Sequence, residues 1–176
     1  MQVTSYKIKI ALFLCLATCT LQLTSCGFHP VYGVNKYTAI GIEEHLAAIE
    51  IGDIPDREGQ FLRNALIDRF YREGRPANPL YKLTVSPISE SRRDLDVTID
   101  SDTTRGQLTL KTNISLIDKQ TSKVLLQRPL RSIASYNILA SEFANRVSEQ
   151  NTRENALNGL ARQIEEQLAL HFKHVQ

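Results

Sequence analysis

Apolar residues recur along this chain with spacings that change from helical to strand-like and back. The aliphatic run Leu46–Ile51 predicts a first strand within residues 45–54. Residues 56–73 then carry one apolar stripe at helical spacing, which predicts a helix. Asp56 is placed to cap the start of this helix, and Gly74 is a natural stop after it.

From residue 81 the apolar spacing becomes two, which is typical of a strand with one buried face. The odd-numbered phase appears twice, with a gap around Pro87 between the two runs. Because proline belongs at an edge or a bulge, one long strand interrupted near Pro87 explains both runs. The apolar members of this phase are Tyr81, Leu83, Val85, Leu95, Val97 and Ile99.

Two further strands follow. Apolar residues from Leu108 to Leu116 alternate in the same way, residues 118–122 form a hairpin loop, and residues 124–136 are a fourth strand. Pro129 marks that fourth strand as an edge or bulged one. We therefore expect a sheet with one apolar and one polar face.

A second helix begins at about Ser141. Its apolar stripe is clear only in the second half, so the first half is expected to be frayed or solvent-facing. The predicted order is β-α-β-β-β-α, an α+β fold in which two helices pack on one face of a four-stranded, mostly antiparallel sheet. The stripe comprises Leu157, Leu160, Ala161, Ile164, Leu168 and Phe172.

The N-terminus has the pattern of a secretory signal peptide. Lys7 and Lys9 precede an almost uncharged run over residues 10–23, which is short for a permanent membrane span. The run ends in Leu23-Thr24-Ser25-Cys26, which looks like a bacterial lipobox, with cleavage between Ser25 and Cys26 and lipid attachment to Cys26. The alternative is an ordinary signal peptide with a chance cysteine.

The predicted division is a lipoprotein signal peptide over residues 1–25, a lipidated tether over 26–44 and a single α+β domain over 45–176. An aspartate after the lipidated cysteine is the usual signal for retention in the inner membrane. Gly27 stands there instead, which favours the outer membrane. We expect a lipid-anchored protein on the periplasmic face of the outer membrane.

Charge and cysteine content narrow the function. Removing residues 1–25 takes away two lysines and leaves 19 basic against 19 acidic residues, so nucleic-acid binding has little support. Two of the three cysteines leave with the signal peptide and Cys26 is consumed by lipid. No thiol then remains for a disulfide, a zinc site or a nucleophile.

No catalytic constellation is evident. The chain has no Gly-x-Ser-x-Gly elbow and no glycine-rich phosphate loop. His171 and His174 share a helix but lack a third metal ligand, and residues 100–106 resemble a calcium loop only faintly, with the glycine displaced and no closing glutamate. We expect no enzyme activity, no cofactor and no metal site.

The chain resembles the lipopolysaccharide-assembly lipoprotein family LptE in its alphaproteobacterial form. The similar pieces are the lipobox with the aromatic tether after it, the start of the first helix, and the last helix, in an element order that fits nearly the whole mature chain. They comprise residues 23–33, 54–66 and 155–172.

This resemblance implies a non-catalytic protein that sits as a plug inside the outer-membrane β-barrel LptD, assists its assembly and helps to pass lipopolysaccharide to the outer leaflet. Lipopolysaccharide phosphates call for lysine or arginine, best as bidentate arginine. The candidates are Arg92 and Arg93 in the long strand and Lys119 and Lys123 beside the hairpin loop. Each is alternatively a solvated surface charge or a contact to the barrel wall.

Two other functions remain open. A lipid-binding auxiliary lipoprotein of an envelope lipid transporter would also be a sheet-and-helix body on a tether, and its partner would be an inner-membrane complex. A purely structural envelope protein is the third interpretation.

Overall fold

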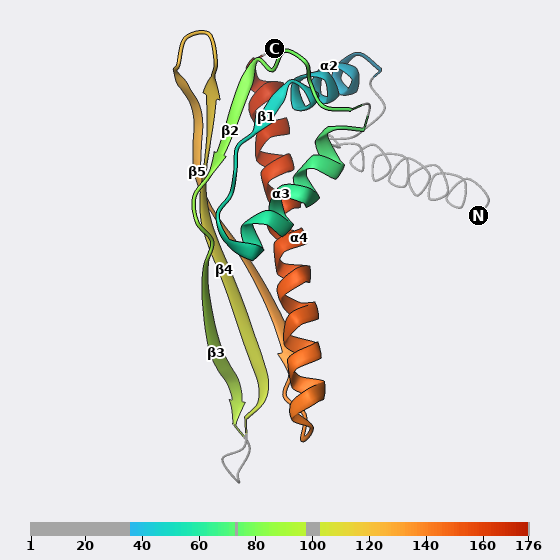
Figure 1. Cartoon of the computed structure of the whole chain (residues 1–176), viewed down its shortest axis with the longest axis vertical. Helices are drawn as coiled ribbons and strands as arrows, with labels where there is room; N and C mark the ends of the chain where they lie inside the picture. The colour runs from blue at the N-terminus through green and yellow to red at the C-terminus, as the bar shows by residue number, and fades with distance from the viewer. Residues whose placement is uncertain (1–35, 73, 98–102, 176) are drawn as a thin grey trace, which may run out of the picture. The chain divides into compact units, whose positions relative to one another are not determined.

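The computed structural model describes residues 36–72, 74–97 and 103–175 (Figure 1). The predicted signal peptide, Cys26 and most of the predicted tether lie outside these residues, as does the turn expected at residues 100–102. The described helices and strands confirm the α+β class. They are α2 (Lys36–Ala47), β1 (Ile49–Ile51), α3 (Asp56–Phe70), β2 (Tyr81–Val85), β3 (Ser89–Val97), β4 (Thr103–Asp118), β5 (Val124–Asn137) and α4 (Glu142–Val175).

One mostly antiparallel sheet contains all five strands, and β4 lies at its centre. β5 pairs with one edge of β4, and β2 and β3 pair with the other edge one after the other, while β1 runs parallel to β2. The interruption predicted near Pro87 is confirmed, because β2 ends at Val85 and β3 begins at Ser89. The sheet is thus four strands wide, as expected, with its second strand in two pieces.

The interruption also shifts the register by one residue. Val85 lies opposite Ile114, but Ser89, four residues further on, lies opposite Lys111, only three residues back. One extra residue in a strand moves its side chains to the other face of the sheet.

The single odd-numbered apolar face predicted for the long strand is therefore wrong in β3. Glu90 and Arg92 lie opposite Leu110 and Leu108 and share their face, and Leu95 is 41% exposed. The side chains of Val97 and Ile99 lie outside the described residues.

One face of the sheet carries the core. The even-numbered side chains of β4 are buried beneath the helices, and the α4 stripe that was predicted from the sequence is buried against them (Figure 1). The part of the chain that the structure describes has no helix with the length and apolar character needed to cross a membrane. The fully buried large side chains are Ile49, Leu62, Leu66, Leu83, Leu108, Leu110, Ile114, Leu116, Leu157, Leu160, Ile164 and Leu168.

Periodicity did not predict α2, which begins inside the predicted tether and contains the predicted boundary between residues 44 and 45. Leu46, expected in the first strand, is a buried residue of this helix, so that strand shrinks to Ile49–Ile51. His45 stacks on Phe172 of α4 with ring centroids 4.8 Å apart. The helix is stabilised by this packing on α4 rather than by a strong apolar stripe of its own.

The predicted cap of α3 is wrong. Pro55 occupies the cap position without a side-chain hydrogen bond, and Asp56 has a φ of 68°. The chain turns tightly here because Gly59 packs on the backbone of Ile54, where an added Cβ would lie 2.8 Å from the Ile54 carbonyl oxygen. A helix entry this tight leaves Asp56 in the left-handed region rather than in the extended conformation of a capping residue. The helix ends at Phe70, three residues before the predicted end.

A second close approach joins α4 to β5. A Cβ added to Gly159 would lie 2.6 Å from the Ser132 hydroxyl oxygen and 3.7 Å from its Cβ. The hydroxyl alone therefore blocks a larger residue at this position.

We expect Gly159→Ala to destabilise the protein by about 1 kcal/mol net, because overpacking costs more than the gain of about 1 kcal/mol in helix propensity. In a Ser132→Ala background the same change should stabilise, because only the propensity gain remains. Thermal unfolding of the four variants measures this coupling. Equal effects in both backgrounds would contradict the packing argument.

Candidate functional site

The face of the sheet that the helices leave open is polar and basic. Its outward positions are the odd-numbered ones of β4 and their register partners, and most carry serine, threonine, asparagine or a basic residue. Among the outward positions whose side chains the structure describes, Glu50 on β1 is the only carboxylate, and Asp96 of β3 is the register partner of Arg105. The basic side chains of this outer face are Lys82, Arg93, Arg105, Lys111 and Arg131.

Two of these cations lie directly opposite each other. Lys111 on β4 and Arg131 on β5 are cross-strand partners, both are exposed, and neither forms an ion pair with a described residue. Like charges in this position destabilise a sheet. This pair therefore leaves a local excess of positive charge on the outer face.

The four basic residues predicted from the sequence are not brought together. Arg93 lies on the outer face, but Arg92 points to the opposite side, towards α4. Lys119 forms an ion pair with Glu50, and Lys123 is exposed in the β4–β5 hairpin, at the other end of β4 from the segment that pairs with β3. The cations at 82, 105, 111 and 131 were missed, although their outward phase in the strands was available as a signal.

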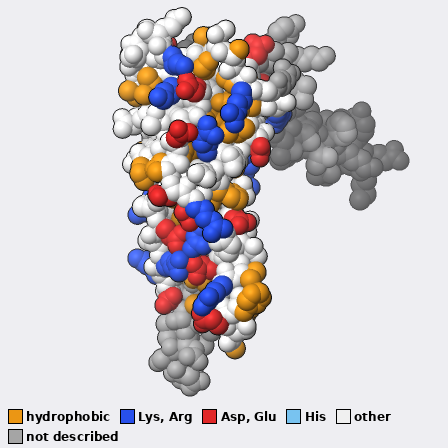
Figure 2. All heavy atoms as spheres, viewed as in Figure 1, with side chains coloured by type: hydrophobic (Ala, Val, Ile, Leu, Met, Phe, Trp, Pro, Cys, Tyr) orange, Lys and Arg blue, Asp and Glu red, His pale blue; other side chains and the backbone are white. Residues whose placement is uncertain are grey.

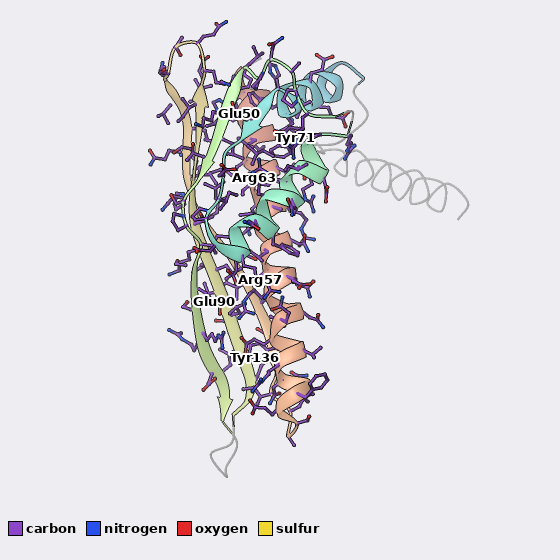
Figure 3. All side chains as sticks on the ribbon, in the orientation of Figure 1. Glu50, Arg57, Arg63, Tyr71, Glu90 and Tyr136 are labelled. Carbon is purple, nitrogen blue, oxygen red and sulfur yellow. The ribbon has the colours of Figure 1, made fainter. Side chains whose placement is uncertain are left out.

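Arg92 belongs to an ionic cluster between β3 and α4. Its guanidinium lies 2.6 Å from Glu149 and 3.0 Å from Glu90, and Arg153 bonds both carboxylates at 2.8 Å. The Arg153 hydrogen bond lowers the pKa of Glu90, and the Glu90 hydrogen bond raises that of Arg153. Figure 2 shows basic and acidic side chains intermingled in the lower half of this view, and Figure 3 labels Glu90 there. Arg92 thus holds the lower half of α4 on the sheet.

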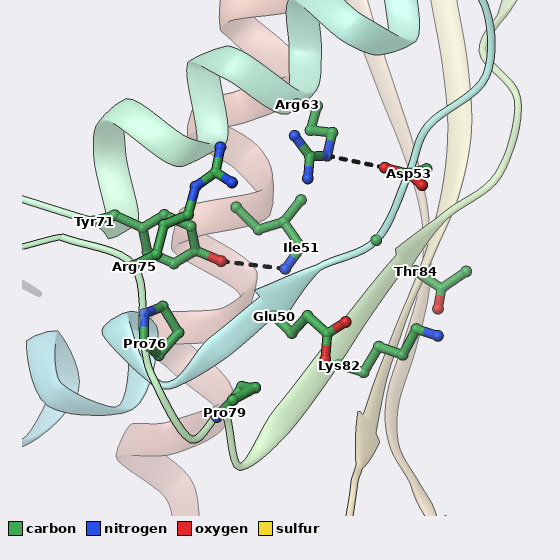
Figure 4. Close-up of a pocket in the computed structure, with 11 residues that line it drawn as sticks. Glu50, Ile51, Asp53, Arg63, Tyr71, Arg75, Pro76, Pro79, Lys82 and Thr84 are labelled. Atoms are coloured by element: carbon green, nitrogen blue, oxygen red, sulfur yellow. Dashed lines mark hydrogen bonds and ion pairs between the residues drawn. The ribbon is translucent and has the colours of Figure 1, made fainter.

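A cleft opens at the free edge of β1, where the end of α3 and the following loop face β1 and β2 (Figure 4). Its volume is about 540 Å³ and its walls are mostly polar. Tyr71 closes the floor: its hydroxyl donates to the Ile49 carbonyl oxygen at 2.6 Å and accepts from the Ile51 amide at 3.3 Å. The side chain therefore takes the place that another strand would occupy on this edge.

The first turns of α4 expose an apolar stripe. Leu139, Phe143 and Val147 follow one another at intervals of four residues, and Phe143 is 77% exposed. The first turns of α4 therefore face solvent on this side, in line with the thin apolar pattern, whereas Thr152, Ala156 and Leu157 further along the same half are buried.

Among the residues that the structure describes, no three histidine, cysteine or acidic side chains lie close enough together to hold a metal ion. Burial, and then the nearby charge of Arg128, lower the pKa of His171. The charge of His174 also lowers the pKa of His171.

Comparison with protein families identifies the chain. The family model LptE, described as lipopolysaccharide-assembly, matches residues 46–171, which is most of the chain and includes the whole sheet, α3 and most of α4. The chain belongs to the LptE family. The predicted resemblance is thereby confirmed, and with it the assignment to lipoproteins of lipopolysaccharide assembly. No curated protein matches the sequence.

Solved structures share the fold of this LptE-family chain. A lipoprotein from Caulobacter crescentus has a TM-score of 0.59 at 23% identity, covering 76% of this chain and 97% of its own. Rare lipoprotein B from Shewanella oneidensis has a TM-score of 0.57 at 11% identity, covering 72% and 96%. A minor lipoprotein from Acinetobacter baumannii has a TM-score of 0.52 at 21% identity, covering 69% and 90%. At these identities the likeness shows the fold alone.

We expect Tyr71→Phe to destabilise the protein by about 1–2 kcal/mol, because it removes both hydrogen bonds to the free edge of β1. Amide hydrogen exchange at Ile51 should accelerate more than exchange in β4. The matched control is Tyr136→Phe, since the Tyr136 hydroxyl has no hydrogen bond to any other described residue. Equal losses for the two variants would show that the hydroxyl does not secure β1.

Proposed function

We propose that this protein is a non-catalytic lipoprotein of the outer membrane that works inside the LptD barrel during lipopolysaccharide insertion. Membership of the LptE family supports the role in lipopolysaccharide assembly. In this proposal Ser25–Cys26 is the cleavage site and acylated Cys26 the anchor on the periplasmic face. About 0.8 kcal/mol per buried CH₂ over several chains holds a protein at a membrane without a spanning helix.

The outer face of the sheet carries the proposal. The lumen of an outer-membrane barrel is polar, and a flat face of hydroxyl groups and cations suits such a wall or the phosphates of lipopolysaccharide. The unpaired Lys111 and Arg131 are the residues that gain most from an anionic neighbour. A lipid-binding auxiliary protein would instead need an apolar cavity, and the 540 Å³ cleft is lined mainly by polar surface.

Pull-down of the acylated chain from detergent-solubilised outer membrane tests the partner. We expect a large β-barrel of the LptD type to be recovered, and depletion of the chain to reduce surface lipopolysaccharide. A Cys26→Ala variant should be recovered in the soluble fraction and bring down less barrel. Recovery of an inner-membrane transporter instead of a barrel would overturn the proposal.

Charge reversal separates the two arginines that are adjacent in sequence. Arg93→Glu should weaken lipopolysaccharide binding by about tenfold without loss of stability, because Arg93 is exposed on the outer face. Arg92→Glu should lower the melting temperature, because it places a third carboxylate beside Glu90 and Glu149.

Binding assays and thermal unfolding of both variants measure the difference. The matched control for net charge is Arg162→Glu on the exposed side of α4. Unchanged affinity in Arg93→Glu, or an equal loss in the control, would remove the outer face as the contact surface.

A further inference from the structure

The cleft beside β1 holds more positive charge than its own residues neutralise. Arg63, Arg75 and Lys82 line it, together with Glu50 and Asp53 (Figure 4). Arg75 and Lys82 have no ion pair with any residue that the structure describes. Glu50 is already bound by Lys119, which lies outside the lining. The three cations and two carboxylates of the lining have a net charge of about +1, counting each side chain as fully ionised at neutral pH.

Arg63 is the least satisfied of these side chains. Its Nε is buried and has no hydrogen-bond partner. The nearest carboxylate oxygen is Asp53 Oδ1 at 3.5 Å, and the Asp53 side chain is fully exposed, so it can turn away at little cost. A buried guanidinium N–H without an acceptor is costly, and an oxyanion in the cleft would supply that acceptor.

The walls of the cleft are built on fixed elements. Arg63 stands on α3, and Lys82 stands on β2, which is paired on both sides. Tyr71 fixes the β1 floor, and two prolines, Pro76 and Pro79, stiffen the loop that carries Arg75. Figure 4 draws the guanidinium groups of Arg63 and Arg75 on the same side of the contact between Tyr71 and Ile51.

The chemistry of the lining selects the ligand class. Guanidinium groups bind phosphate and carboxylate oxygens in bidentate fashion. With Asp53 turned away, the lining has a net charge of about +2. A phosphomonoester carries about −1.5 to −2 charges at pH 7 and balances that charge, whereas a single carboxylate balances only half of it. The polar lining excludes an acyl chain, and the volume of about 540 Å³ accommodates a sugar phosphate.

We propose that this cleft is a binding site for a phosphomonoester, held by Arg63, Arg75 and Lys82 with Asp53 displaced. The site shares Lys82 with the outer face of the sheet but lies at the β1 edge, away from Lys111 and Arg131, and it requires neither a barrel partner nor the lipid anchor. The phosphate is carried either by a soluble sugar phosphate or by a lipid headgroup.

The test uses the full chain in detergent micelles, labelled with ¹⁵N-arginine, and follows the Nε–Hε signal of Arg63. Inorganic phosphate, glucose 1-phosphate and phosphatidic acid in the micelle are added separately, against sodium chloride at matched ionic strength. We expect the Arg63 signal to move to saturation with a phosphate ligand and to stay in place with chloride. Movement with the soluble phosphates identifies a soluble source, and movement with phosphatidic acid alone identifies a headgroup.

Variants of the lining residues test both the location of the site and the direction in which each charge changes phosphate affinity. Arg75→Gln and Lys82→Gln leave the Arg63 reporter intact and should each weaken phosphate binding by about tenfold. Asp53→Asn should tighten it, because it removes the anion that competes for Arg63. Arg162→Gln, on the exposed side of α4, is the matched control and should bind like the unmodified chain.

Each remaining outcome would overturn the site: no movement of the Arg63 signal, equal movement with chloride, or weaker binding in Asp53→Asn. Because the readout is phosphate binding alone, a failure here leaves the barrel pull-down unaffected. Failure of the pull-down likewise leaves this measurement intact.

Discussion

The packing of α4 against the even-numbered face of β4 and β5 is the contact on which the rest of the structure depends. Leu157, Leu160, Ile164 and Leu168 are fully buried there, and each buried side chain of this size contributes about 1.5–3 kcal/mol. With no cysteine in the described part of the chain, no disulfide can replace this contact. The packing of α4 leaves the opposite face of the sheet uncovered, and this is the face on which the proposed function depends.

The one-residue shift between β2 and β3 divides this arrangement into two halves. On the β2 side of the shift the helix-facing side chains are aliphatic. On the β3 side, Glu90 and Arg92 face the helix and meet Glu149 and Arg153. Because the pKa of Glu90 is lowered in the folded chain, its contribution to stability is present above its ordinary pKa of 4.5 and is lost as the pH falls through the lowered value. Acid therefore loosens the lower half of α4 before it affects the aliphatic half.

Periodicity predicted the sheet, the helix over 56–70 and the buried stripe of α4, because an element that is buried on one side has apolar residues at regular spacing. It failed where tertiary contacts decide. The helix Lys36–Ala47 depends on stacking of His45 on Phe172, and the face of Leu95 depends on a single inserted residue that composition does not reveal. The predicted basic candidates failed to converge for a different, local reason. Adjacency made Arg92 and Arg93 look equivalent, whereas alternation in a strand sends them to opposite faces.

The edge strands of the sheet carry features that oppose the addition of another strand, and this affects how a partner can bind. Tyr71 occupies the free edge of β1. On β5, Pro129 lacks an N–H, and the Arg131 carbonyl oxygen accepts a hydrogen bond from Gln163 of α4. β3 is rich in charged residues of both signs, which discourage pairing at its outer edge. A partner that cannot extend the sheet must contact side chains across its face. A broad, polar wall satisfies that requirement, and the lumen of a barrel offers one.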